Sequence, residues 1–181
     1  AGLNGSLTLG PLPALSQGLI DSMDYAPDLT EAKSHSYDLF AAKKKLDEAS
    51  DTYDDTRESY AQNTYNVRSA RHTYEAALYE YKMAVQNFEM NFRNAFDSVK
   101  DYSQVLRSAQ TSLAFQESSY ASMEMKYRQG TISHNALLEA EDALNESKET
   151  VETARRNLFT AYRTYYWAVN YGVTSSGQTG T

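Results

Sequence analysis

Residues Tyr127–Leu144 read YRQGTISHNALLEAEDAL, and this stretch decides the fold. Its Gly130 is the only glycine between Gly18 and Gly172. On both sides of it, the sequence has the apolar spacing of long amphipathic helices. A lone glycine between two such patterns predicts the end of one helix and a change in chain direction.

The residues around the glycine predict how the chain turns. Gly130 suits the left-handed conformation that ends a helix, and Ser133 is a favourable N-cap for the next one. Ile132 and Leu137 have the spacing of a hydrophobic staple across that N-terminus. The sequence therefore predicts a tight, exposed turn between two antiparallel helices. The same pattern is also that of a plain connector with no further role.

Large side chains recur every seven residues between Pro27 and Gly130, a segment with neither Gly nor Pro. One stripe comprises Leu39, Leu46, Tyr53, Tyr60, Val67, Tyr74, Tyr81 and Phe88, and a second comprises Leu78, Val85, Phe92, Val99, Leu106, Leu113, Tyr120 and Tyr127. Sustained spacing of seven is typical of coiled-coil packing. Two overlapping stripes indicate neighbours on more than one side of the helix. After the turn, a third stripe comprises Leu137, Leu144, Val151, Leu158 and Tyr165.

These patterns predict an all-α fold of long antiparallel coiled-coil helices without β-barrel strands. The expected helices are 27–50, 56–129 and 134–171, preceded by an irregular linker over 1–26 that has room for a short helical turn within 14–23 and followed by a disordered tail over 173–181. The first boundary leaves two alternatives open. Asp55 with Glu58 fits a capping pair after a chain reversal at 50–56. The unbroken spacing through Tyr53 instead favours one continuous helix over 27–129.

Composition excludes several functional classes. The 181 residues carry 24 acidic and 17 basic side chains, and the net charge of −7 argues against nonspecific nucleic-acid binding. There is no cysteine, and no apolar run approaches the roughly 18 residues of a membrane-spanning helix. His35, His72 and His134 share no metal-ligand spacing. No phosphate loop, nucleophile elbow or zinc-binding helix is visible, so we expect no enzyme activity, cofactor or metal.

The turn resembles the helix-turn-helix tip of TolC-type outer membrane efflux proteins. In that family an aromatic and often a basic residue precede the glycine, and a Ser or Thr with a leucine pair opens the returning helix. The letters YRQGTISHNALL fit this pattern. Residues Ala154–Gly172 are similar to the end of a repeat in the family, and the sequence before Ser34 is similar to the linker between its two halves.

This resemblance implies a half-repeat of a tunnel-forming subunit, three of which form a helical conduit for efflux or protein export. The implied location is the cell envelope: outer membrane or periplasm in a Gram-negative bacterium, cell surface in a Gram-positive one. An adaptor (membrane fusion) protein of the periplasmic type and an inner-membrane pump are the implied partners. The implied adaptor contact comprises Tyr127, Arg128, Gly130, Thr131, Ile132 and Ser133. Glu139 is the implied pore-lining residue, because acidic residues near the tunnel entrance ring the pore in the family.

The sequence also departs from the family. Members usually insert a β-hairpin between the first two helices of the half-repeat, and nothing at 50–56 provides two strands of about 9–11 residues. A structural coiled-coil spacer or scaffold of the cell envelope is therefore the alternative function. One further cluster is open to two interpretations, as helix packing or as an interfacial membrane anchor. It comprises Phe159, Tyr162, Tyr165, Tyr166, Trp167 and Tyr171.

Overall fold

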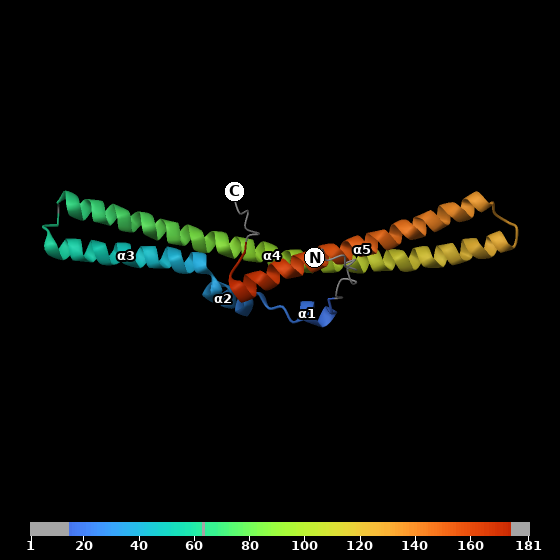
Figure 1. Ribbon diagram of the computed structural model, residues 1–181, viewed down its shortest axis with the longest axis horizontal. Helices are drawn as coiled ribbons and strands as arrows, with labels where there is room; N and C mark the ends of the chain where they lie inside the picture. The colour runs from blue at the N-terminus through green and yellow to red at the C-terminus, as the bar shows by residue number, and fades with distance from the viewer. Residues whose placement is uncertain (1–14, 63, 175–181) are drawn as a thin grey trace, which may run out of the picture. The chain divides into compact units, whose positions relative to one another are not determined.

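A computed structural model describes residues 15–62 and 64–174 of the chain, and these residues form helices without any strand (Figure 1). The helices are α1 (Gln17–Asp21), α2 (Tyr25–His35), α3 (Tyr37–Ser59), α4 (Tyr65–Arg128) and α5 (His134–Tyr171). The all-α prediction is confirmed. Supercoiling of the helices stays a prediction.

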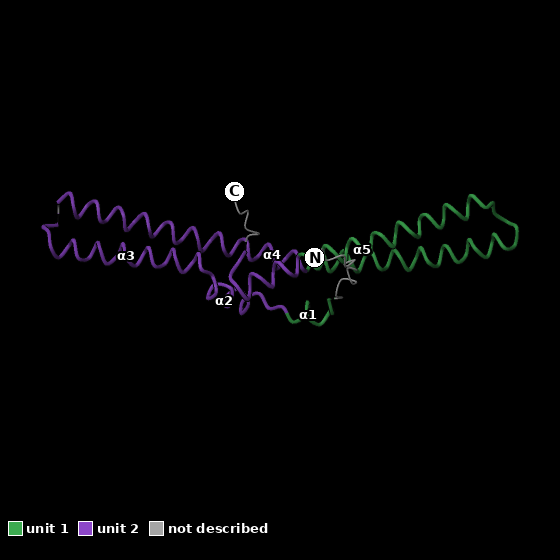
Figure 2. The backbone as a smooth tube through the Cα atoms, viewed as in Figure 1, with its two compact units in different colours: residues 1–22, 100–160 green, residues 23–99, 161–181 purple. Residues whose placement is uncertain are grey.

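The chain divides into two compact units, and α4 and α5 each contribute to both (Figure 2). Unit 1 comprises residues 1–22 and 100–160, which include α1 and the turn between α4 and α5. Unit 2 comprises residues 23–99 and 161–181, which include α2 and α3. Both units are therefore built from segments that lie far apart in the sequence.

In unit 2, α3 lies beside the first part of α4 (Figure 1). Leu46 and Ala49 pack against Ala77 in a buried cluster. Tyr53 stacks on Tyr74 with ring centroids 5.9 Å apart, and Lys45 pairs with Glu80 at 2.5 Å. Because the α4 numbers fall as the α3 numbers rise, the two helices are antiparallel.

The chain reversal between α3 and α4 lies at residues 60–64, because α3 ends at Ser59 and α4 begins at Tyr65. The predicted reversal at 50–56 was wrong, and so was one continuous helix over 27–129. Asp55 and Glu58 lie inside α3 and cap no helix. Tyr53 packs against α4, and this contact stabilises an α3 that continues past residue 50.

A second break, at Ser36 between α2 and α3, was not predicted. Ser36 is extended at φ −76° and ψ 112°, and its side chain accepts a hydrogen bond from the Leu39 N–H as the N-cap of α3. Gly172 lies directly against it: a Cβ built on Gly172 would stand 2.4 Å from the Ser36 Cα. The predicted helix 27–50 is therefore two helices, separated where the end of α5 passes.

Aromatic rings form the core of unit 2 near this break. Phe92 is fully buried and lies 5.8 Å from the Tyr25 ring and 6.0 Å from the Tyr165 ring. Phe96 contacts the same two tyrosines edge-on. The Tyr165 hydroxyl donates to the Asp28 carboxylate, which also accepts from the Asp24 N–H. Burial, and then this hydrogen bond, raise the pKa of Tyr165 far above its ordinary value.

Unit 1 is a second antiparallel helix pair. Ala109 on α4 packs against Val151 and Ala154 on α5, and Leu106 and Leu113 cover this cluster. Small residues at such a contact allow the two helix backbones to approach closely.

The short helical turn that the sequence allows within 14–23 is present, because α1 occupies Gln17–Asp21. Its Ile20 is only 2% exposed, and the Lys100 Nζ donates to the Ile20 carbonyl at 3.2 Å. Burial of this one apolar side chain therefore anchors the short helix. Residues 1–14 of the linker and 175–181 of the predicted tail lie outside the described residues.

Candidate functional site

The turn after α4 is a complete Schellman motif. Gly130 adopts φ +73°, and its N–H donates to the Tyr127 carbonyl at 2.9 Å. The Thr131 N–H donates to the Lys126 carbonyl at 3.0 Å, and the Thr131 hydroxyl bonds the same carbonyl. These bonds satisfy carbonyl groups that the end of a helix leaves without partners. The predicted role of Gly130 is confirmed.

The next helix begins as the sequence predicts. The Ser133 hydroxyl accepts a hydrogen bond from the Ala136 N–H at 3.2 Å, and the Ser133 carbonyl accepts from the Leu137 N–H. Ser133 is therefore the N-cap of α5. Ile132 and Leu137 are both half-buried, and their contact as a hydrophobic staple stays a prediction. The turn is fixed by its own local bonds.

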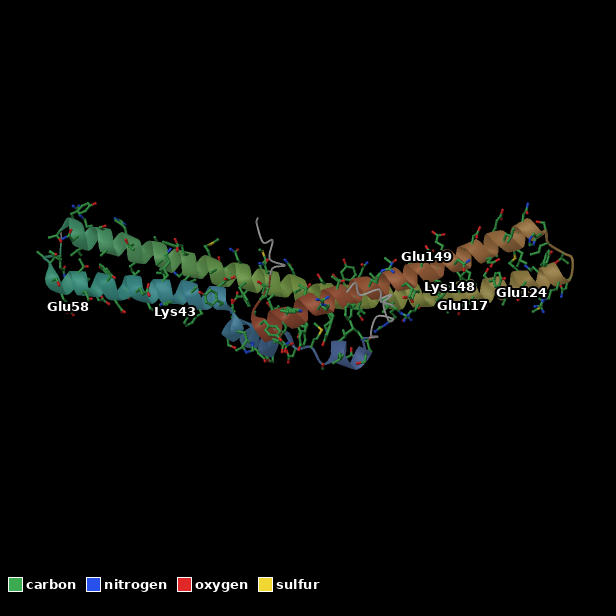
Figure 3. The ribbon with its side chains drawn as sticks, in the orientation of Figure 1. Lys43, Glu58, Glu117, Glu124, Lys148 and Glu149 are labelled. Carbon is green, nitrogen blue, oxygen red and sulfur yellow. The ribbon has the colours of Figure 1, made fainter. Side chains whose placement is uncertain are left out.

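Two side chains on α4 give this tip its chemical character. Tyr127 is 40% exposed, and its ring lies 5.6 Å from the His134 ring across the turn. Arg128 is exposed and pairs with Glu124 one turn earlier. Glu124 lies on α4 near the tip (Figure 3). The structure thus brings Tyr127, Arg128 and the capping residues together on one exposed end, which presents an aromatic ring and a paired cation.

Glu139 lies on α5 in the same unit and is exposed. Within residues 15–62 and 64–174 it forms no ion pair, and no group of acidic or histidine side chains there has the arrangement of a metal site. A charged ring needs copies of Glu139 from several subunits. Its role as a pore-lining residue therefore stays a prediction.

The face of α4 that points away from α3 carries exposed apolar side chains in unit 2. We call Tyr65, Tyr79, Met83 and Met90 the outer stripe; they are 77%, 67%, 53% and 55% exposed. Ala77 and Tyr81 pack against α3, and Tyr79 and Met83 come two positions after them. Two positions are about 200° around a helix of 3.6 residues per turn, so Tyr79 and Met83 lie on the opposite face. The sequence predicted neighbours on more than one side of this helix, and α3 covers only one of them.

The aromatic cluster near the end of α5 divides between core and surface. Tyr165 is buried against Phe92 and Phe96. Tyr166, Trp167 and Tyr171 are each about half exposed. The packing interpretation therefore describes Tyr165, while the other three rings remain available to a neighbouring molecule.

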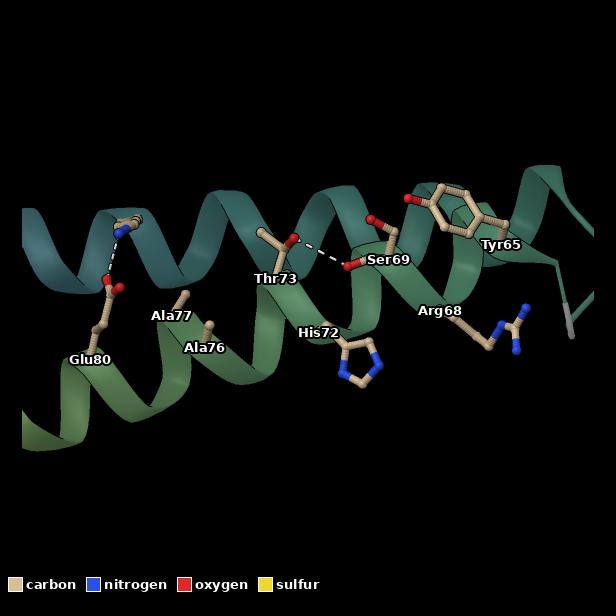
Figure 4. Close-up of a pocket in the computed structure, with 9 residues that line it drawn as sticks. Tyr65, Arg68, Ser69, His72, Thr73, Ala76, Ala77 and Glu80 are labelled. Carbon is tan, nitrogen blue, oxygen red and sulfur yellow. Dashed lines mark hydrogen bonds and ion pairs between the residues drawn. The ribbon is translucent and has the colours of Figure 1, made fainter.

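Two hollows flank the α3–α4 pair, and sequence reasoning missed both. An open groove of about 710 Å³ runs along one flank of α4 and is also lined by Lys45 of α3 (Figure 4). It is lined by Lys45, Tyr65, Arg68, Ser69, His72, Thr73, Ala76, Ala77 and Glu80. A more polar hollow of about 470 Å³ is lined by Tyr53, Arg57, Gln62, Val67, Arg68 and Arg71. The spacing of Arg68 and Arg71 was visible in the sequence, but Arg57 joins them only through the register of the two helices.

No family model matches this sequence, and none of the curated proteins is significantly similar to it. Over the described residues, no helix combines the length and the apolar character that crossing a membrane requires. The tip, the outer stripe and the two hollows are therefore the features on which a function can be argued.

Proposed function

We propose that this chain is a TolC-like subunit of a trimeric helical conduit in the cell envelope, used for efflux or protein export. In this proposal the tip formed by Tyr127, Arg128, Gly130, Thr131, Ile132 and Ser133 docks an adaptor protein that works with an inner-membrane pump. The subunit itself carries out no chemical step. It provides a helical wall and a contact point.

The observation that carries this proposal is the outer stripe. Large apolar side chains gathered on one exposed helix face are unfavourable in water and mark a contact surface. Because α3 already covers the opposite face of α4, a partner on the outer stripe would give α4 neighbours on two sides. A helix in the wall of a closed helical barrel needs neighbours on two sides, whereas a two-stranded rod needs only one.

The geometry of the tip supports the adaptor contact. Its backbone is fixed by the bonds of Gly130 and Thr131 and by the Ser133 cap. A preorganised turn loses little conformational freedom on binding, so its contacts contribute more fully to affinity. The exposed Tyr127 ring is a favourable anchor for a partner helix.

The experiment is a binding measurement between this chain and the helical hairpin of a candidate adaptor, by isothermal titration calorimetry. The variant Gly130→Val with Ser133→Ala should abolish binding and leave the helical circular dichroism nearly unchanged. Gln62→Ala, in the α3–α4 reversal, is the matched control and should bind normally. If the tip variant binds as well as the unchanged chain, the tip is not the adaptor contact.

A structural spacer of the cell envelope is the second candidate, and the short α3–α4 reversal favours it. Residues 60–64 join the two helices directly, so the chain has no insertion there of the kind that usually accompanies a conduit in the family it resembles. A spacer predicts no adaptor affinity and no dependence on the tip sequence. The same titration separates the two functions.

A further inference from the structure

The polar hollow beside the α3–α4 reversal gathers three arginines. Arg57 comes from α3, and Arg68 and Arg71 come from the first two turns of α4. Gln62 adds an amide from the reversal itself. All of these side chains line one space of about 470 Å³ in unit 2. The tip of the proposed conduit uses none of them.

The positive charge of this hollow is only partly compensated. The Arg57 guanidinium lies 3.4 Å from the Asp54 carboxylate, and the Arg71 Nε lies 3.6 Å from the Glu75 carboxylate. Both ion pairs are about half exposed, so each contributes little to stability. Another anion can therefore readily replace the carboxylate. Arg68 has no carboxylate partner within the described part of the chain. Three guanidinium groups therefore face two weakly held carboxylates.

Two local features add to this preference for an anion. The first turn of α4 contains no acidic residue, so the positive end of its helix dipole has no side-chain anion there. The hydroxyl of Thr64, the residue before α4, is buried and has no hydrogen-bond partner among residues 15–62 and 64–174, so it does not cap the helix. Arg57 is meanwhile held in place over the Tyr53 ring at 5.5 Å, and Tyr53 is itself stacked on Tyr74.

We propose that this hollow, which we call the arginine hollow, binds a phosphate-type oxyanion through Arg57, Arg68 and Arg71. Guanidinium groups donate paired hydrogen bonds in a planar fork that matches phosphate oxygens. Donors from three side chains suit a tetrahedral anion with several acceptor oxygens better than a planar carboxylate. The phosphate belongs either to a soluble phosphate ester or to a lipid headgroup. Tyr60 and Tyr65, which lie between Arg57 and Arg68 in the sequence, are exposed and are the residue type that sits at a membrane interface.

The first experiment is an NMR titration of the arginine Nε–Hε signals with sodium phosphate, with sodium chloride at matched ionic strength as the reference. We expect saturable shifts of Arg57, Arg68 and Arg71 with phosphate alone. Arg68→Gln should weaken phosphate binding at least about tenfold, because it removes a charged hydrogen-bond donor. Arg163→Gln, which changes an exposed arginine on α5 of the same unit, is the matched control and should leave the affinity unchanged. All of these residues are exposed, and circular dichroism checks that each variant is folded.

Equal responses to phosphate and chloride, or equal losses in the Arg68 and Arg163 variants, would overturn the proposal. The second experiment identifies the source of the phosphate by flotation with phosphatidylcholine vesicles, with and without phosphatidylglycerol. Recruitment by phosphatidylglycerol that Arg68→Gln abolishes and Arg163→Gln preserves assigns the site to a lipid headgroup. Saturable binding of inorganic phosphate without recruitment assigns it to a soluble ester.

Discussion

Two glycines with positive φ end the two long helices, and they differ in their surroundings. Gly130 at φ +73° has open space where a side chain would begin, whereas a Cβ on Gly172 would meet the Ser36 backbone at 2.4 Å. Gly130→Ala should therefore lower the free energy of unfolding by about 1–2 kcal/mol, the cost of a left-handed L-residue. Gly172→Ala should cost clearly more, because the Ser36 backbone must also move. Thermal unfolding followed by circular dichroism measures both.

The matched control for these glycines is Gly18→Ala. Gly18 lies in helical α1, a Cβ added to it would meet no atom within 4 Å, and it does not need a positive φ. Alanine is the better helix former there, so no loss of stability is expected. If Gly172→Ala were as mild as Gly18→Ala, the close approach of α5 to Ser36 would be contradicted.

Tyr165 makes stability depend on pH in the alkaline range. Its pKa is raised above the ordinary value of 10.0 by burial and by the Asp28 hydrogen bond. Above pH 10 the unfolded chain loses this proton while the folded chain keeps it, so the free energy of unfolding falls as the pH rises further. Below pH 10 both states hold the proton and the contribution is constant. In Tyr165→Phe, urea unfolding between pH 9 and 11 should show a smaller decline.

The same variant has a second effect at neutral pH. Removing a hydrogen bond to a carboxylate costs about 1.5–3 kcal/mol, and the Asp28 oxygen keeps its bond from the Asp24 N–H. Asn170→Ala, on the exposed side of α5, serves as the control and should alter neither the stability nor its pH dependence. An unchanged alkaline slope in Tyr165→Phe would show that this tyrosine is not the responsible group.

At the scale of elements, the antiparallel register of α3 and α4 fixes distances between exposed sites. Asp51 and Ala76 are exposed on the two helices, and the chain has no cysteine to compete for labels. Spin labels on Asp51→Cys and Ala76→Cys should lie within about 25 Å, given interaxial distances of about 8–10 Å plus the label arms. One continuous helix would separate them by about 38 Å at 1.5 Å per residue. Double electron–electron resonance distinguishes the two values.

The elements also show which features local sequence can predict. Gly130 and Ser133 satisfy helix ends with bonds to residues within five positions, so their roles could be inferred from the sequence alone. The α3–α4 reversal was misplaced because the capping chemistry of Asp55 and Glu58 is weaker than the continued packing of α3 on α4. The Ser36 break was missed although Ser is a favourable N-cap, because it depends on Gly172 at the other end of the chain.

The candidate sites follow the same division. The tip residues are neighbours in the sequence, so their association required no knowledge of the fold. The arginine hollow depends on which turn of α3 faces which turn of α4, and a shift of the reversal from 50–56 to 60–64 changes that pairing completely. The outer stripe lies between these cases, because its spacing was visible while its exposure was not.

For the whole molecule, the outer stripe predicts self-association. Tyr79→Lys with Met83→Lys should lower the weight-average mass in sedimentation equilibrium, because charged side chains cannot be buried at an apolar contact without a partner. Phe115→Lys, at an equally exposed position of unit 1, is the control and should leave the mass unchanged. If the stripe variant associates as the unchanged chain does, the stripe is not the contact between subunits.

The two-part composition of unit 2 determines the order in which the molecule can mature on the ribosome. The α3–α4 pair joins residues 21 positions apart at Tyr53 and Tyr74 and 35 positions apart at Lys45 and Glu80, and it can form while synthesis continues. The bond from Tyr165 to Asp28 and the contact of His35 with the Val169 carbonyl span 137 and 134 positions. Closing such long loops is slow, so the contacts of α2 with α5 form only after nearly the whole chain has emerged, whereas Tyr25 of α2 can meet Phe92 of α4 earlier. A nascent chain halted before residue 161 would hold a finished hairpin beside an open seam, a natural binding site for a chaperone.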